Sequence, residues 1–560
     1  MDIKTLNGAD FGNLATAKGA FDTLSTAFGQ HVENWQHEVV DRLTRSEWTG
    51  TAGGHAQTRM QTLHDELQAA QQEIGLISRA LQDASEAFVA AQTHLSNALN
   101  DAKAHKLTVA PDGGITWDKD PNSPNFAGTD ADTLAKDIQS RITAALTEAD
   151  HADRTISSRL AHLTTNATNA TGLDSTVAKN DTAAANALHQ VPAAGTDPNS
   201  VKAWWDSLTD EQQRMMALTH PEQIGNLDGI PATGRDQANR ITLAKTHADL
   251  QQRLDALGPE PDSVVGTPYG AVEPPDHKLW KQEHDGLVDQ LNGIKAIEDR
   301  MKVPVDANHP QTYLLGYDNA GRGHAIVASG NPDTADNVST YVPGTGARLG
   351  HIGSDIERSD AMVAAANAAG TGKTTSSITW IGYDAPQSLA DATDDQYAKD
   401  AEKKLVGFEN GLHATHNGTI GNNTILGHSY GTTTIGYTMK DHGLPVDNVV
   451  LIASPGAGVD SAKDLRIDPS HVYAAQSPSD MIGMAAAIDP GGMAQNVWDN
   501  TVSNLPFVDD DDHHLIHGRQ TTVSDFGANV MPVDPKAGHS DYWNNGSPTL
   551  AAMGQVIAGT

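Results

Sequence analysis

The sequence contains no cysteine, and this absence narrows the chemistry available to the protein. Without thiols the chain has no disulfide bonds, no thiolate nucleophile and no cysteine-ligated zinc or iron–sulfur centre. Basic residues are also scarce, since Lys and Arg number 37 against 71 Asp and Glu, for a net charge of −34. Such a surface repels polyanions, which argues against nucleic-acid binding.

Long apolar runs and a conventional signal peptide are missing as well. No window holds about 18 or more consecutive apolar residues, so the sequence predicts no transmembrane segment. The start, "MDIKTLNGADFGNL", lacks a basic stretch followed by an apolar core, which argues against a cleaved signal peptide. A cysteine-free chain folds in either redox environment, so the sequence does not decide the cellular compartment. At 560 residues the chain is expected to form about two to four domains.

The first hundred residues carry a helical pattern. Apolar residues recur at steps of three and four from Met60 to Leu95, which predicts a long helix with a seam packed on another helix. A similar stripe covers residues 14–43, and the glycines of "SEWTGTAG" separate the two. Each stripe needs a partner to bury against, so we expect a long antiparallel helical hairpin.

Trp48-Thr49-Gly50 in the turn of this hairpin resembles the W-x-G turn of the WXG-type proteins handled by type VII secretion. The resemblance covers about residues 8–103 and implies a helical partner chain; the alternative is a plain hairpin for self-association. It favours a secreted or cell-envelope location reached without a signal peptide, with a cytoplasmic location as the alternative. The family's export signal, a tyrosine followed four residues later by an acid, is absent around "SNALNDAKAHK". The export route therefore stays open.

The middle of the chain connects this hairpin to a different architecture. Residues 107–125 predict a small β-hairpin around Asp112-Gly113-Gly114, a helix follows at about 130–163, and "TTNATNATG" and "VPAAGTDPNSV" are expected to be polar linkers. In 201–243, Ser207 or Thr209 is expected to cap a helix that ends near Pro221, and no function follows from this segment. We therefore divide the chain into 1–105, 106–200, 201–305 and 306–560.

The last part alternates strand-like and helical stretches, which predicts a mostly parallel sheet flanked by helices. The expected strands are 313–317, 324–329, 337–342, 378–383, 424–426, 449–453 and 471–475. The expected helices are 355–369, 395–412, 432–442 and 548–557.

Within this part, "TILGHSYG" contains a G-x-S-x-G motif centred on Ser429. A strand precedes the motif and a helix follows it, which is the setting of a nucleophile elbow. The flanking glycines permit a sharp turn, and the helix N-terminus favours negative charge nearby. Ser429 is therefore the expected nucleophile.

A serine hydroxyl needs a histidine base and an acid that orients it, in the chain order serine, acid, histidine for this kind of fold. Asp480 follows the strand at 471–475, and His539 lies beyond it in "KAGHSDYW", so these two are the expected acid and base. Rival acids are Asp460 and Asp464. Rival bases are His513, His514 and His517 in "DDDDHHLIH", where Asp509–Asp512 with the first two histidines would alternatively hold a metal.

The negative charge of a tetrahedral intermediate needs backbone N–H donors. Tyr430, the residue after the nucleophile, is expected to supply one. The loop after the strand at 337–342, "PGTGA", is expected to supply the other from Thr345 or Gly344. No cofactor is required.

Several segments together resemble a family of α/β-hydrolases of unassigned physiological role that are often fused to WXG-like helices. They are "AWWDSLTDEQQ", "IGNLDGIPATGRDQAN", "NPDTADNVSTYVPGTGA", "WIGYDAP", "GHSYG", "ASPGAG" and "GHSDYW". The resemblance implies an α/β-hydrolase fold over 306–560 with Ser429, Asp480 and His539 at the triad positions, and it supplies no substrate.

These patterns predict an esterase or lipase-like serine hydrolase that forms an acyl-enzyme and acts on a small-molecule or lipid ester. The alternative is a type VII secretion-associated effector or interaction protein whose hairpin binds a partner chain. The segment "MIGMAAAIDPGGMAQNVWDNTVSN", residues 481–504, is either a lid over an acyl pocket or ordinary packing.

Overall fold

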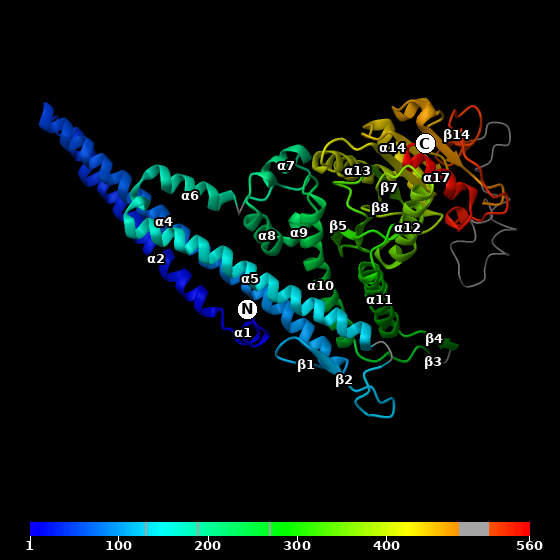
Figure 1. Cartoon of the computed structure of the whole chain (residues 1–560), viewed down its shortest axis with the longest axis horizontal. Helices are drawn as coiled ribbons and strands as arrows, with labels where there is room; N and C mark the ends of the chain where they lie inside the picture. Colours follow the sequence, from blue (N-terminus) through cyan, green and yellow to red (C-terminus); the bar gives the residue numbers. More distant parts are fainter. Residues whose placement is uncertain (129–130, 188–189, 268–269, 481–513) are drawn as a thin grey trace. The chain divides into compact units, whose positions relative to one another are not determined.

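The computed structural model describes residues 1–128, 131–187, 190–267, 270–480 and 514–560. These residues form two compact units (Figure 1). The first unit comprises residues 1–192 and 207–221, and the second comprises residues 193–206 and 222–560. The rival base His513 and the metal alternative at Asp509–Asp512 lie outside the described residues, as does the predicted lid at 481–504.

The first unit is built from long helices and one small β-hairpin. Its helices are α1 (Ile3–Gly8), α2 (Gly12–Trp35), a π-helical turn (Gln36–Val40), α3 (Asp41–Arg45), α4 (Thr51–Ala104), α5 (Ala131–Asn169), α6 (Ser175–Ala187) and α8 (Asp210–Thr219). The β-hairpin pairs β1 (Leu107–Val109) with β2 (Ile115–Trp117), as the sequence predicts. Thr209, one of the two expected caps, caps α8 and exchanges hydrogen bonds with Gln212 in a capping box.

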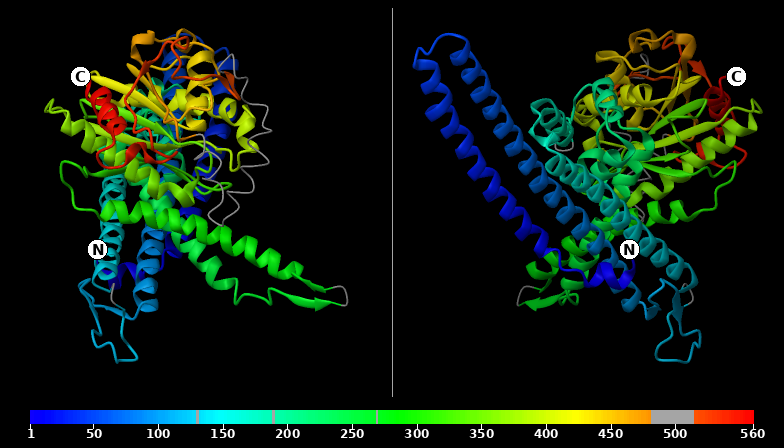
Figure 2. Two further views of the ribbon diagram at one scale, coloured as in Figure 1. Left: turned by 90° about the vertical axis from the view of Figure 1, so that its right-hand side faces the viewer. Right: turned by 60° about the vertical axis from the view of Figure 1, so that its left-hand side comes forward.

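The expected antiparallel helical hairpin is formed by α2 and α4, which run side by side (Figures 1 and 2). The a/d seam of α4 contributes buried residues such as Leu81, Phe88 and Leu95, and Phe88 stacks on Phe11 with ring centroids 5.1 Å apart. The apolar stripe of α2 is less covered, because Val32 is its one buried residue and Leu24 is 42% exposed. Trp48, in the turn, is 50% exposed.

The prediction of a polar linker at "TTNATNATG" is wrong over most of that segment, since α5 continues through it to Asn169. Asn166 is buried against α4 and α6, and its side-chain amide donates to Asp181 at 2.8 Å and to Glu73 at 3.3 Å. Asn and Thr have weak intrinsic helix propensity. Packing within the first unit therefore overrides the local preference.

The second unit is an α/β structure around one eight-stranded sheet. Its strands are β5 (Thr312–Asp318), β6 (His324–Ser329), β7 (Asn337–Val342), β8 (Thr375–Ile381), β9 (Asn422–His428), β10 (Asn448–Ile452), β11 (Val472–Ala475) and β14 (Asn529–Val530), with the short pair β12 (His514–Leu515) and β13 (Gly518–Arg519) outside it. The strand order is β14-β11-β10-β9-β7-β8-β6-β5, and β6 runs antiparallel to both of its neighbours. The other pairings in the sheet are parallel, so the sheet is mostly parallel as predicted.

Helices cover both faces of this sheet. They are α12 (Ile352–Ala368), α13 (Gln396–Thr415), α14 (Tyr430–Asp441) and α17 (Pro548–Ala558). Residues alternate between the faces with the period of two expected for strands. In β9, for example, Ile425 joins the core that includes α13 and α14, whereas Leu426 joins the core that includes α12 and α17.

Further helices lead into the sheet from the N-terminal side. They are α7 (Pro198–Asp206), α9 (Pro221–Gly225), α10 (Ala232–Ala256) and α11 (Pro275–Lys302), and the small hairpin of β3 (Val265–Thr267) and β4 (Gly270–Val272) joins the last two (Figure 2). Helix α10 packs along β5. Among the described residues, no helix combines the length and the apolar character needed to cross a membrane.

Side chains from 226–240 occupy the free edge of β5. Asn226 both accepts from the Tyr317 N–H (2.9 Å) and donates to the Tyr317 carbonyl (2.8 Å). Asp236 accepts the Leu314 N–H at 2.8 Å, and Asn239 donates to the Leu314 carbonyl at 2.9 Å. This segment, to which the sequence assigns no function, therefore pairs with the backbone of the edge strand.

One strand prediction needs correction, and one strand of the sheet was not predicted. The expected strand at 378–383 begins earlier and ends earlier, as β8 (Thr375–Ile381), because Ser376 and Ser377 are fully buried despite being polar. Strand β14 has only two residues, Asn529 and Val530, both exposed, so it leaves no periodic signal in the sequence.

Candidate active site

Ser429 lies at the corner where β9 ends and α14 begins. Its backbone has φ 54° and ψ −129°, a conformation that non-glycine residues rarely adopt. The corner is held by two bonds, from the Ser429 N–H to the Ile452 carbonyl (2.9 Å) and from the Thr432 N–H to the Ser429 carbonyl (2.9 Å). The strand, sharp turn and helix are those of a nucleophile elbow.

The glycines on either side of Ser429 are required by close packing. A Cβ at Gly427 would lie 2.7 Å from the Thr432 nitrogen, and a Cβ at Gly431 would lie 2.0 Å from the Val342 carbonyl oxygen. Neither position tolerates a side chain without movement of the backbone. The motif's fixed glycines therefore allow β7 and the elbow to approach each other.

The loop after β7 lies directly against the elbow. A Cβ at Gly344 would lie 2.7 Å from the Tyr430 nitrogen and 2.8 Å from the Ser429 Cβ, so the Gly344 backbone is in contact with both. The loop is fixed by the Tyr383 hydroxyl, which donates to the Pro343 carbonyl at 2.8 Å. Gly344 and Tyr430 are thus brought together, and Thr345, the next residue of the loop, is half-buried.

Asp480 and His539 form a buried pair. Asp480 follows β11, His539 follows β14, and His539 Nδ1 lies 2.6 Å from Asp480 Oδ1. Asp480 is fully buried, and 9% of His539 is exposed. The carboxyl ends of neighbouring parallel strands lie at one edge of a sheet, which is also where β9 delivers Ser429. In the described part of the chain, no hydrogen bond joins the Ser429 hydroxyl to His539.

His428 connects the elbow to His539. Its Nε2 lies 2.7 Å from the His539 carbonyl oxygen, and the two imidazole rings are 4.6 Å apart between centroids. The indole of Trp543 packs edge-on against the His428 ring at 5.1 Å. Burial holds the pKa of His428 well below its usual value, and the nearby His539 and Arg358 act in the same direction. His428 is therefore a neutral donor.

Three of the rival residues, His517, Asp460 and Asp464, have side chains that the structure describes. His517 is buried with its Nε2 2.7 Å from the Ala392 carbonyl oxygen, and its ring packs edge-on against Tyr430. Asp460 and Asp464 are exposed. Among the described residues, no group of three or more His, Asp and Glu side chains is arranged to hold a metal ion.

Three neighbours of the site are missing from the expectations drawn from the sequence: His428, Gln476 and Tyr542. His428 and Tyr542 do lie in the segments "GHSYG" and "GHSDYW" that carry the family resemblance. Their contacts depend on how β9, β11 and the C-terminal loop meet, which spacing does not reveal.

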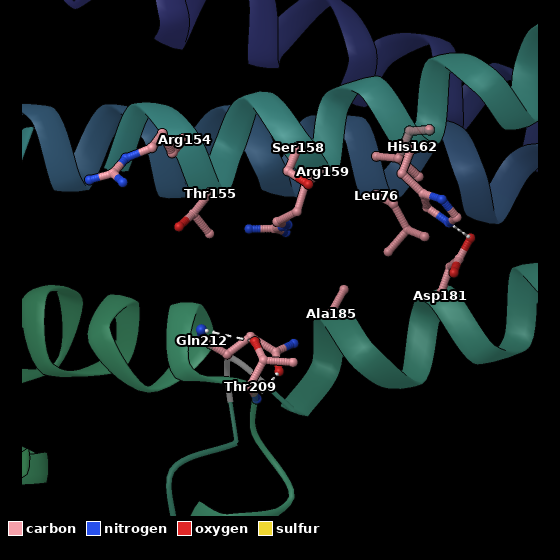
Figure 3. A pocket seen from close by; sticks show the side chains of 11 residues that line it. Leu76, Arg154, Thr155, Ser158, Arg159, His162, Asp181, Ala185, Thr209 and Gln212 are labelled. Carbon is pink, nitrogen blue, oxygen red and sulfur yellow. Dashed lines mark hydrogen bonds and ion pairs between the residues drawn. The ribbon is translucent and has the colours of Figure 1, made fainter. Parts of the chain in front are cut away.

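A cavity of about 500 Å³ belongs to the first unit, whereas Ser429, Asp480 and His539 all belong to the second. Helices α4, α5, α6 and α8 supply its walls (Figure 3). Two of its polar side chains contact carboxylates of the protein, Arg159 with Asp83 and His162 with Asp181 at 2.9 Å. Its lining mixes polar and apolar side chains, and we assign no ligand to it.

Comparison with known proteins places the second unit in a family. Residues 318–490 match a family model described as alpha/beta hydrolase. The chain is 30% identical over 387 residues to the uncharacterized protein Rv2079 of Mycobacterium tuberculosis, covering 66% of this chain and 57% of that protein. It thus spans little more than half the length of that relative.

A second relative is covered more fully. The chain is 32% identical over 206 residues to the uncharacterized protein Rv0963c of M. tuberculosis, which is 35% of this chain and 73% of that protein. Among solved structures, esterase LipW from Mycobacterium marinum matches 51% of this chain and 90% of its own, with 13% identity and a TM-score of 0.27, too low to add to the assignment. The chain therefore belongs to the same family as Rv0963c and contains an α/β-hydrolase domain.

Proposed function

We propose that this chain is a serine hydrolase of carboxylic esters. The observation that carries the proposal is the buried Asp480–His539 pair, joined at 2.6 Å and placed at the same sheet edge as the strained elbow residue Ser429. An imidazole held by a carboxylate beside a serine at an elbow is the arrangement that activates a hydroxyl for attack on an acyl carbon.

In the proposed mechanism the Ser429 Oγ attacks the ester carbonyl carbon while His539 Nε2 takes the hydroxyl proton. His539 then gives that proton to the leaving alcohol, and an acyl-enzyme remains on Ser429. Water, activated by the same imidazole, hydrolyses the acyl-enzyme. Asp480 holds His539 in the tautomer that presents Nε2 and stabilises the imidazolium that forms. A catalytic hydrogen bond such as the one from the Ser429 hydroxyl to His539 Nε2 often shortens only when substrate is bound.

The tetrahedral intermediates carry a negative oxygen that needs donors. Tyr430 is the first residue of α14. The first N–H groups of a helix have no intrahelical hydrogen-bond partners, so the Tyr430 N–H is suited to donate to the oxyanion. We assign the second donor to Thr345 or Gly344, because Gly344 packs so close to the elbow that a Cβ there would lie 2.7 Å from the Tyr430 nitrogen. Donors fixed before reaction stabilise the oxyanion with little reorganisation.

The test is labelling of the full chain with a fluorophosphonate probe. Wild type should label, and Ser429→Ala should not. Asp480→Asn and His539→Ala should label far more slowly. Ser359→Ala is the matched control, because Ser359 is also buried and its hydroxyl, on α12, bonds to the Thr379 hydroxyl of β8. Labelling of Ser429→Ala at the wild-type level would rule the mechanism out. A series of acyl esters of increasing chain length would then define whether the substrate is a small or a lipid ester.

A second proposal concerns the helical hairpin of α2 and α4. The apolar stripe of α2 buries one residue, Val32, while Leu24 is 42% and Trp48 is 50% exposed. A stripe that α4 leaves partly uncovered favours an α-helical partner chain, as the W-x-G resemblance implies for type VII secretion. Crosslinking of the full chain in cells should capture a helical partner that Leu24→Glu releases. Equal capture of a partner by wild type and by Leu24→Glu would count against this proposal.

A further inference from the structure

Tyr542 touches the carboxylate at the centre of the proposed site. Its hydroxyl oxygen lies 2.5 Å from Asp480 Oδ2, the carboxylate oxygen that does not face His539. Gln476 Nε2 also reaches Oδ2, at 3.2 Å. Both oxygens of the fully buried Asp480 are therefore occupied by donors, Oδ1 by His539 and Oδ2 by Tyr542 and Gln476.

The direction of the Tyr542 hydrogen bond follows from its other partner. The backbone N–H of Ser477 lies 2.9 Å from the Tyr542 hydroxyl oxygen. An N–H group can only donate, so the hydroxyl oxygen accepts there and its own hydrogen is left to point at Asp480. The Ser477 N–H therefore donates to the Tyr542 hydroxyl oxygen, and the Tyr542 O–H donates to the Asp480 carboxylate.

One short turn of backbone supplies the contacts to both carboxylate oxygens. Tyr542 lies three residues after His539, in the 3-10 turn Asp541–Trp543. The turn is held by the bond from the Asp541 N–H to the Gly538 carbonyl (3.1 Å) and by the Gly538 N–H, which donates to the Asp541 side chain at 2.8 Å. His539 and Tyr542 thus each hydrogen-bond to one oxygen of Asp480, which fixes the rotation of the carboxylate.

We propose that Tyr542 is a positioning residue that orients Asp480 toward His539. The inference rests on the proposed hydrolase function. Tyr542 and Asp480 are both fully buried, so water does not replace the hydroxyl when it is removed. Burial and the adjacent carboxylate raise the pKa of the Tyr542 hydroxyl, which keeps it protonated and donating at neutral pH.

The experiment compares steady-state hydrolysis of p-nitrophenyl acetate by full-length wild type and Tyr542→Phe. Without the donor the carboxylate loses its fixed rotation, so kcat should fall roughly 10- to 100-fold. KM should be unchanged, because the hydroxyl touches Asp480 and not the substrate. Tyr341→Phe is the matched control, since Tyr341 is also fully buried and its hydroxyl donates to a buried carboxylate, Asp355, at 3.3 Å.

A double-mutant cycle separates positioning from a general structural effect. If Tyr542 acts through Asp480, then Tyr542→Phe should slow fluorophosphonate labelling in wild type but add nothing in Asp480→Asn. The downfield proton resonance of His539 Nδ1–H should move upfield in Tyr542→Phe and stay in place in Tyr341→Phe. An equal slowing in both backgrounds, or a wild-type kcat, would overturn the inference.

Two further outcomes are distinguishable. If Tyr542→Phe does not fold, Gln476→Leu tests the same Oδ2 and should lower kcat with KM unchanged; an unchanged kcat overturns the inference. If Ser429→Ala retains activity, the proposed function itself fails. If Ser429→Ala is inactive and Tyr542→Phe equals wild type, only the role of Tyr542 is lost.

Discussion

His428 donates its Nε2–H to the main-chain carbonyl of His539 across 2.7 Å. A carbonyl oxygen only accepts, so the imidazole proton of His428 must lie on Nε2. The residue before the proposed nucleophile is therefore tied to the backbone of the proposed base. The elbow and the C-terminal loop are joined by this bond as well as by the contact between the two imidazole rings, which are tilted by 39°.

Replacing His428 should loosen the proposed base. His428→Ala removes the donor and leaves the buried His539 carbonyl without a partner, so kcat on an acyl ester should fall roughly 10-fold. His428→Gln places an amide N–H near the same position and should recover part of the loss. The measurement is kcat with the rate of fluorophosphonate labelling. Identical rates in His428→Ala and wild type would contradict the role.

His428 should also lower the free energy of unfolding of the protein in acid. Burial, chiefly, holds the pKa of His428 in the folded state well below its ordinary value of about 6.5, so the unfolded chain binds the proton more readily. Its contribution is present above about pH 6.5 and is lost as the pH falls below that value. Urea unfolding between about pH 7.5 and 5 should show a smaller loss for His428→Gln than for wild type. Parallel pH profiles would exclude the effect.

Glu409 should act in the opposite direction. It is fully buried on α13, and burial raises its pKa from 4.5 to about 7. A carboxyl with a raised folded pKa stabilises the fold below about pH 4.5 and loses that contribution as the pH rises through about 7. The loss amounts to roughly 3 kcal/mol at its limit. The unfolding free energy of Glu409→Gln should therefore fall less between about pH 5 and 8, and an equal fall would refute the assignment.

Gly344→Ala should damage catalysis more than folding. The added methyl would lie 2.6 Å from the His428 carbonyl oxygen and 2.7 Å from the Tyr430 nitrogen, where the proposed oxyanion donors meet. Displacing one such donor lowers kcat roughly 100- to 1,000-fold. Gly286→Ala, a helical glycine with no atom within 4 Å of the added Cβ, is the control. Retention of wild-type kcat by Gly344→Ala would remove this loop from the proposed site.

Local patterns in the sequence predict most of the second unit. The strands at 324–329 and 337–342 match β6 and β7, and the elbow falls between β9 and α14 as its glycines require. Periodicity and turn chemistry are properties of neighbouring residues, so these features are readable from one chain. The same holds for the long seam of α4.

Contacts between distant segments are not readable in that way. The bonds of Tyr542 to Asp480 and of His428 to His539 span 62 and 111 residues of sequence. The helix through Asn166 exists because Glu73 and Asp181 receive its amide, against its local propensity. Burial of polar groups depends on partners that only the folded chain brings together.

The pairing of Asn226, Asp236 and Asn239 with β5 has a consequence for how the molecule meets other chains. An unpaired edge strand is a template on which a second strand adds, leading to sheet extension or aggregation. Here side chains take up the Leu314 and Tyr317 backbone groups that such a strand would need. The sheet is closed at this border, so self-association by strand addition there is disfavoured, and copies of the chain that assemble must do so through other surfaces.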